Sequence, residues 1–193
     1  MKKFISVLIA VLTLIMCAAP AFAADVSRID EYKAMFVQKV GPEVDGLKVD
    51  YVAFSPEVEE GTKVPVVLYF HGKGQGKAPG SQIEENNFPL WASDELQRRF
   101  NNGGAYLLAF RTREEDNEDW SNKYIPAVKA AADAFIEEHR DSIDLTRIYV
   151  GGFSMGGMMT LLICPVRLHK IPRKMRSKNG HSVTYTYQSG IML

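Results

Sequence analysis

The pentapeptide G-F-S-M-G at residues 152–156 constrains the fold of this chain more than any other feature. A β-branched and aromatic run, residues 147–151, leads directly into it, and an apolar stretch, residues 155–164, leads directly out. The first pattern is typical of a buried strand and the second of a packed helix. Glycines two residues on either side of Ser154 relieve the crowding of a sharp turn. The sequence therefore predicts a strand, a tight turn and a helix, with Ser154 at the turn.

Strand-like and helix-like segments also alternate before this turn. The length of 193 residues and the apolar fraction of 46% suit one globular domain. One segment, residues 66–70, is apolar on both faces, as in a sheet that helices cover on both sides. The order predicts an α/β domain with a doubly wound, mostly parallel sheet. The expected strands are residues 46–54, 64–70, 105–110 and 147–151, and the expected helices are residues 91–100, 125–136 and 155–164.

A serine at a strand-turn-helix junction is the arrangement of a nucleophile elbow, which exposes the hydroxyl above the sheet. Two other interpretations stay open. One is that the turn binds a phosphate group at the N-terminus of the helix, although it lacks the G-x-G-x-x-G and G-K-[ST] spacings of nucleotide-binding loops. The other is that the turn is purely structural and that Ser154 serves only as a helix cap. We favour the nucleophile elbow, with Ser154 as the nucleophile of an acyl-transfer reaction.

The segment H-G-K-G at residues 71–74 follows the apolar strand expected at 64–70. Acyl transfer requires two N–H groups that stabilise the oxyanion of the tetrahedral intermediate. We expect one from the residue after the serine, Met155, and the other from Lys73 or Gly72. His71 precedes Ser154, whereas the base of such a site follows its serine, so we expect His71 to order the loop.

With these residues in hand, the chain resembles the α/β-hydrolase superfamily, and within it secreted esterases of the polyhydroxybutyrate depolymerase and feruloyl esterase kind. The resemblance covers roughly residues 47–162. It depends on the strand ending in His71-Gly72 and on D-L-T-R-I-Y-V-G-G-F-S-M-G-G-M-M-T at residues 144–160. It implies a serine hydrolase of small-molecule or polymeric esters, with acyltransferase or peptidase relatives. It implies no metal or organic cofactor and no nucleic-acid partner.

The order of the triad in this superfamily is Ser, then Asp or Glu, then His. No carboxylate occurs after Asp144, and of the 39 residues (193 − 154) that follow Ser154 only His169 and His181 are histidines. Without an acid, a histidine base holds the wrong tautomer part of the time. The triad acid and base are therefore not identifiable. We expect this chain to be a weak or inactive esterase, and the alternative is a non-catalytic truncated hydrolase fragment or a hydrolase-fold binding protein.

Residues 166–193 form an atypical basic tail with no Asp or Glu. Pro165 would end the preceding helix early. We expect a reading-frame shift near residues 162–165, or another disruption of the gene, and a genuine short variant is the alternative. Alternating apolar residues in the tail are compatible with a short strand, namely Val183, Tyr185 and Tyr187. The six basic residues are Arg167, Lys170, Arg173, Lys174, Arg176 and Lys178.

Residues 1–23 have the layout of a signal peptide. Two lysines precede an apolar run, residues 4–19, which is too short for a membrane span, and A-F-A at residues 21–23 is a small-x-small cleavage site. We expect cleavage after Ala23, a secreted or periplasmic hydrolase domain over residues 24–165, and no stable membrane insertion. An uncleaved anchor is the alternative, and a lipid anchor at Cys17 is less favoured. Cleavage would leave Cys164 without an internal disulfide partner.

For an acidic segment and for the two tryptophans we prefer a structural interpretation to a functional one. The acidic segment at residues 114–119 would attract calcium, but it lacks the glycine and ligand spacing of a calcium loop, so we expect a solvated loop. Trp91 and Trp120 would suit the wall of a substrate cleft, yet apolar packing at the loop edges is the default expectation for both.

Overall fold

A computed structural model describes residues 24–84, 86–100, 102–112 and 120–164. The expected signal peptide, the acidic segment at residues 114–119 and the basic tail at residues 166–193 lie outside the described residues. Within the described part of the chain, none of the helices combines the length and the apolar character that crossing a bilayer requires.

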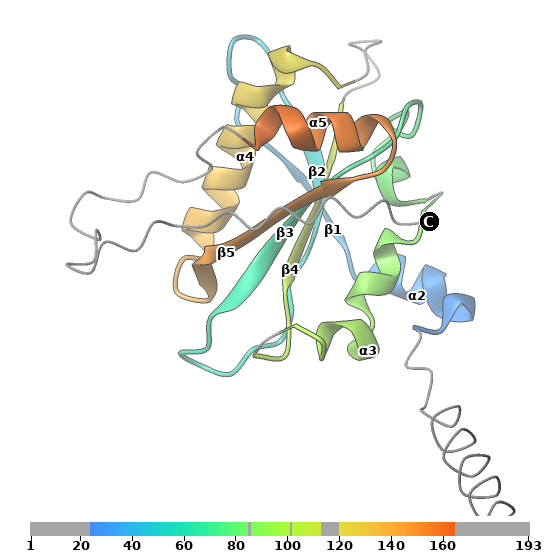
Figure 1. The fold of residues 1–193 in the computed structure, drawn as a ribbon, viewed down its shortest axis with the longest axis vertical. Coiled ribbons are helices and arrows are strands. Elements are labelled where there is room, and N and C mark those ends of the chain that lie inside the picture. The colour runs from blue at the N-terminus through green and yellow to red at the C-terminus, as the bar shows by residue number, and fades with distance from the viewer. Residues whose placement is uncertain (1–23, 85, 101, 113–119, 165–193) are drawn as a thin grey trace, which may run out of the picture.

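Among the described residues, five strands form one mixed sheet in the order β1-β2-β4-β3-β5 (Figure 1). The neighbours β4, β3 and β5 run parallel to one another, whereas β1 and β2 add two antiparallel pairings at one side. The predicted doubly wound, mostly parallel α/β sheet is thereby confirmed. The strands are β1 Val37–Val40, β2 Asp50–Phe54, β3 Val64–Phe70, β4 Tyr106–Arg111 and β5 Ile143–Gly152.

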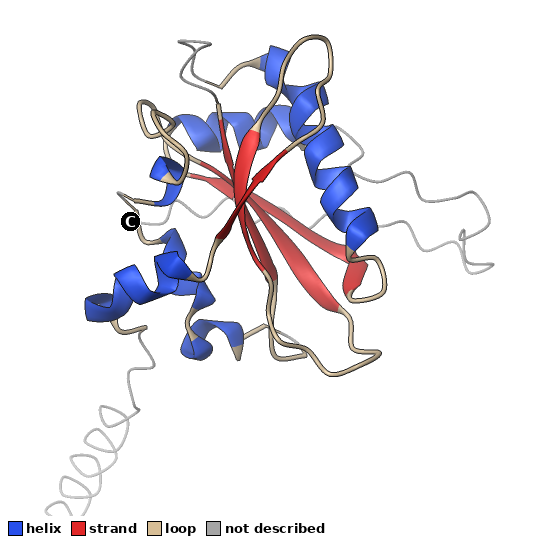
Figure 2. Ribbon diagram, turned by 180° about the vertical axis from the view of Figure 1, so that it is seen from behind, coloured by secondary structure: helices blue, strands red, loops and turns tan. Residues whose placement is uncertain are grey.

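Helices cover both faces of this sheet (Figure 2). On β3, Leu68 and Phe70 face one apolar cluster and Val67 and Tyr69 face another, because successive side chains of a strand point to opposite sides. The first cluster includes α4 (Ile125–Glu138) and α5 (Met155–Ile163), and the second includes α2 (Ile29–Ala34) and the short helix η3 (Phe88–Ala92). The remaining short helices are η1 Val26–Arg28, η2 Ser81–Ile83, α3 Asp94–Gln97 and η5 Asn122–Tyr124.

The boundaries predicted from sequence agree best in the centre of the sheet. The strand predicted at residues 64–70 is β3, residue for residue. The helix predicted at residues 91–100 is wrong as a single element, because Ser93 adopts an extended conformation and caps a new helix, α3, accepting a hydrogen bond from the N–H of Leu96 at 3.4 Å. The strand predicted at residues 46–54 begins only at Asp50, since Asp45 and Gly46 take positive φ angles in a turn.

Candidate active site

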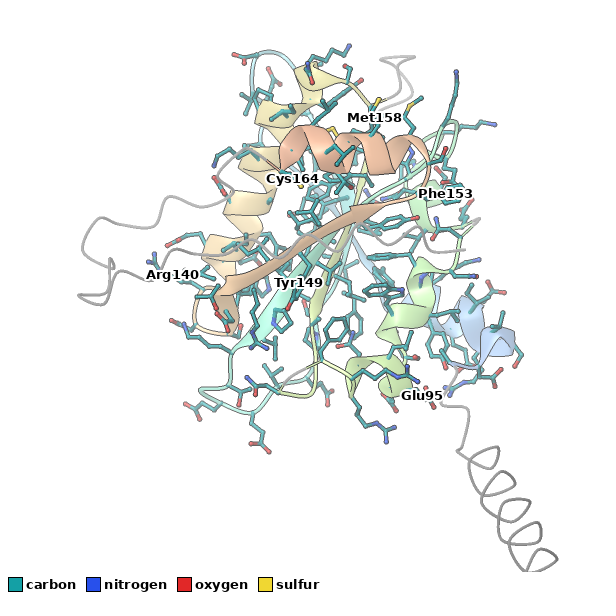
Figure 3. All side chains as sticks on the ribbon, in the orientation of Figure 1. Glu95, Arg140, Tyr149, Phe153, Met158 and Cys164 are labelled. Atoms are coloured by element: carbon teal, nitrogen blue, oxygen red, sulfur yellow. The ribbon has the colours of Figure 1, made fainter. Side chains whose placement is uncertain are left out.

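Ser154 lies in the turn between β5 and α5, so the predicted strand, turn and helix are present. Its backbone has φ 52° and ψ −112°, a strained conformation for a residue with a side chain. The side chain is exposed, and within the described residues it makes no capping hydrogen bond to α5. Figure 3 shows Phe153 where β5 meets α5, with Cys164 at the far end of that helix. The turn therefore presents the Ser154 hydroxyl outward at the carboxyl end of the parallel strands.

The two glycines of the motif have a steric role that the structure makes concrete. A Cβ added to Gly156 would overlap the carbonyl oxygen of Phe70 and lie 2.8 Å from that of His71. A Cβ on Gly152 would lie 2.5 Å from the carbonyl oxygen of Gly156 and 2.8 Å from that of Phe70. Because these neighbours are backbone atoms at the end of β3 and in the first turn of α5, they cannot move aside as a flexible side chain could. Only glycine fits at both positions.

The loop after β3 is anchored by His71, whose side chain is buried. The backbone N–H of Thr112 can only donate, so Nε2 of His71 accepts at 3.4 Å and the ring proton resides on Nδ1. Nδ1 in turn donates to the carbonyl oxygen of Gly72 at 2.6 Å, and the indole N–H of Trp120 donates to the carbonyl oxygen of His71 at 3.0 Å. Both ring nitrogens thus bind loop backbone, which fits the loop-ordering role expected of this histidine.

The same loop lies directly against the turn that carries the serine. A Cβ added to Gly72 would come within 2.8 Å of the Phe153 ring, so the two backbones approach closely at this point. The N–H of Gly72 donates to Oε1 of Gln75 at 2.8 Å, and the N–H of Gln75 donates to the carbonyl oxygen of Gly72 at 3.3 Å. Gly72 and Lys73 were the two candidates for the second oxyanion donor. The N–H of Gly72 is engaged within its own loop, and Lys73 is the next residue along the turn.

Met155, the other expected N–H donor, is the first residue of α5. The N–H groups of the two residues that follow it, Gly156 and Gly157, donate to the carbonyl oxygens of Phe153 at 2.8 Å and Ser154 at 2.9 Å. The N–H of Met155, as the first residue of α5, has no acceptor further along the helix and lies at the positive end of the helix dipole. The helix start beside Ser154 is thus suited to stabilise negative charge.

The described histidines are both held by backbone groups. His139 ends α4, where its Nδ1 lies 3.0 Å from the carbonyl oxygen of Phe135 and its ring stacks on the Phe135 ring. His169 and His181 lie outside the described residues. Within the ranges that the structure describes, no group of three or more His, Cys, Asp or Glu residues is arranged to hold a metal ion.

A buried ion pair near the loop was missed in the sequence. Arg111, the last residue of β4, pairs through Nη2 with Oδ2 of Asp50, and each side chain is 5% exposed. Nη1 of Arg111 donates to the carbonyl oxygen of Gly76 at 3.0 Å. The only sequence signal was that Arg111 directly follows the apolar run at residues 105–110, and an arginine needs an anionic partner only where it is buried, which no local pattern shows.

The two tryptophans pack rather than line an open surface. Trp120 is buried against Phe70, with ring centroids 5.1 Å apart, and it supports the loop through the hydrogen bond to His71. Trp91 is half-buried between Phe88 and Phe100. The apolar packing preferred for both residues is what the structure has.

The chain matches no family model and no curated protein sequence. Among solved structures it is similar to a thermostable esterase, with a TM-score of 0.51 and 25% identity, over 65% of this chain and 36% of that one. It is also similar to an acylaminoacyl peptidase of Pyrococcus horikoshii (TM-score 0.45, 20% identity, 66% of this chain and 20% of that one). A third similar structure is the propionate-bound esterase Est2 of Thermogutta terrifontis (TM-score 0.44, 17% identity, 66% and 44%). This chain thus spans about a third of the length of the thermostable esterase, 36%. The fold comparison depends on that structure, because the TM-scores of the other two are below 0.5.

Proposed function

We propose that this chain, an α/β-hydrolase by fold, is a serine hydrolase of carboxylic esters that acts through Ser154. The observation that carries the proposal is the positive φ of Ser154, 52°, in a tight turn that two glycines without room for a side chain make possible. A strained, exposed serine between the end of β5 and the N-terminus of α5 has a chemical use and no evident structural one.

In the proposed reaction Oγ of Ser154 attacks the acyl carbon of the ester, and its proton passes to the departing alcohol. The tetrahedral intermediate collapses to an acyl-enzyme, which water then hydrolyses to release the acid and the free serine. The N–H groups of Met155 and Lys73 stabilise the oxyanion. We assign Lys73 rather than Gly72 because the N–H of Gly72 is bound to Gln75.

We propose that this chain, taken alone, is a weak esterase. The printed residues include no Asp or Glu after Asp144, so they do not supply an acid that would orient a histidine base. In a serine protease, loss of a triad member still leaves about 10³- to 10⁴-fold catalysis over water, contributed by the oxyanion site and by binding. Esters with a good leaving group, such as p-nitrophenyl acetate, are the substrates on which residual activity should be seen.

Labelling with a fluorophosphonate probe tests the role of Ser154. The full chain should be labelled, and Ser154→Ala should abolish the label because the phosphonylated oxygen is then absent. Ser27→Ala is the matched control, since Ser27 is an exposed serine inside the short helix η1, which Asp25 caps. Equal labelling of the Ser154→Ala chain, or no labelling of the native chain, would contradict the proposal.

Export is a separate part of the proposal. Residues 1–23 would direct the chain across a membrane and be removed after Ala23, so the mature chain would begin at Ala24. The intact mass of the chain recovered from the culture medium or periplasm of an expressing bacterium should correspond to residues 24–193. A full-length mass in the membrane fraction would favour the uncleaved anchor instead.

A further inference from the structure

The ion pair of Asp50 and Arg111 occupies a fixed place at the end of the sheet. Asp50 is the first residue of β2 and Arg111 the last of β4, and the two are direct partners in the antiparallel register. Both side chains are almost fully buried. Burying two charges costs several kcal/mol per ion, about as much as their attraction returns, so apolar residues of similar size are often as stable. Burial of the pair is therefore weak evidence by itself that the pair serves stability.

Arg111 has a further contact that connects the pair to the loop after β3. While Nη2 binds Asp50, Nη1 donates to the carbonyl oxygen of Gly76 at 3.0 Å and lies 3.4 Å from that of Thr112. A guanidinium is planar and rigid, so a partner at one nitrogen orients the other. Asp50 therefore aims Arg111 at the Gly76 carbonyl.

Gly76 is packed against the ring of His71. A Cβ added to Gly76 would lie 2.8 Å from Nε2 of His71 and 3.0 Å from Oγ1 of Thr112. The loop is thus fixed twice by buried groups, at Gly72 by Nδ1 of His71 and at Gly76 by Arg111. Lys73 lies between these two points.

We propose that Arg111, oriented by Asp50, is a positioning residue that holds the loop of residues 71–76 so that the N–H of Lys73 meets the oxyanion. The inference rests on the proposed function of Ser154. Arg111 acts on the reaction through the loop backbone, chiefly the Gly76 carbonyl, and not by contact with the substrate, so its loss should slow the chemical step and leave ground-state binding of the acyl group unchanged.

The test compares three variants of the full chain. Asp50→Leu/Arg111→Met removes both charges together, which avoids an unpaired buried ion. Arg111→Lys keeps the charge but replaces the fork by a single ammonium group. The matched control is Asp144→Leu/Arg147→Met, because Arg147 also pairs with an aspartate and donates to a loop carbonyl, that of Lys63 at 2.9 Å, at the opposite end of β3.

Three measurements are made on each variant: the rate and the affinity of fluorophosphonate labelling at Ser154, hydrogen exchange of the amides of residues 71–80, and thermal unfolding. For Asp50→Leu/Arg111→Met we expect the maximal labelling rate to fall about 10- to 100-fold at unchanged probe affinity. Exchange should accelerate in residues 71–80 alone. Arg111→Lys should lie between this variant and the native chain, and the control should match the native chain in labelling and loop exchange.

The outcomes separate the two proposals. Labelling of Ser154 at the native rate in Asp50→Leu/Arg111→Met overturns the positioning role and leaves the proposed function standing. A native chain that is not labelled at Ser154 overturns the proposed function, and with it the catalytic purpose of the positioning. If hydrogen exchange in residues 71–80 is the same in Asp50→Leu/Arg111→Met as in the native chain, Arg111 does not anchor the loop, whatever the labelling shows. Equal slowing in the control pair overturns the anchoring as well, because the effect would then be one of general stability.

Discussion

Gly156 lies so close to Phe70 that a Cβ on the glycine would overlap the carbonyl oxygen at the end of β3. The N–H of Phe153 donates to that same oxygen at 3.0 Å. The carbonyl oxygen of Phe70 thus contacts the turn on both sides of Ser154 and holds the turn close to the end of β3.

Gly156→Ala should destabilise the fold by about 3 kcal/mol, because the new methyl group meets main-chain atoms that cannot repack. Gly151→Ala is the control in the same strand, since nothing lies within 4 Å of its added Cβ. The control should be neutral or more stable by about 0.5 kcal/mol, as glycine is a poor strand residue. Urea unfolding measures both. Similar losses in the two variants would show that the close approach to Phe70 is not the cause.

Ser154→Gly should be more stable than Ser154→Ala by about 1 kcal/mol. Alanine keeps the strain of the positive φ at this position, whereas glycine adopts that conformation at no steric cost. Neither variant carries the hydroxyl, so both lose the fluorophosphonate label. The difference between their melting temperatures therefore reports the backbone strain at residue 154. Equal melting temperatures would mean that the turn relaxes around alanine.

Gly72 and Phe153 should be energetically coupled. An added methyl group at Gly72 would come within 2.8 Å of the Phe153 ring, so Gly72→Ala should cost about 1 to 2 kcal/mol. Phe153 is 52% exposed, so Phe153→Ala should cost little and should remove the obstacle. A double-mutant cycle measured by chemical unfolding should give a favourable coupling of about 1 kcal/mol. Additive effects would place the strain of Gly72→Ala elsewhere in the loop.

Asp144 should contribute stability that is lost in acid. Partial burial raises the pKa of its carboxyl, but hydrogen bonds from the hydroxyl and N–H of Thr146 and from Arg147 outweigh burial, so the pKa lies below its ordinary 3.8. A lowered pKa means that the contribution is complete above 3.8 and disappears as the pH falls through the folded value. Asp144→Asn should therefore be less stable than the native chain at neutral pH, and the difference should shrink well below pH 3.8. A pH-independent difference in unfolding midpoint would contradict this.

Local patterns determined much of the fold from the sequence alone. The unbroken apolar run at residues 64–70 is β3, and the strand, turn and helix around Ser154 are present because glycine spacing and side-chain periodicity act over a few neighbouring residues. The break at Ser93 was missed because apolar residues on both sides of it continue a helical pattern that its extended backbone interrupts.

Only the tertiary structure decided how the parts of the site support one another. That Gly72 gives its N–H to Gln75, and that Arg111 reaches both Asp50 and the Gly76 carbonyl, depends on which strand ends meet. Asp50 and Arg111 are distant in the chain and become neighbours through the pairing of β2 with β4. The sequence by itself determined where a strained serine turn would form, because that depends on local sterics. The groups that hold the loop beside it depend on contacts between distant segments, which no local pattern encodes.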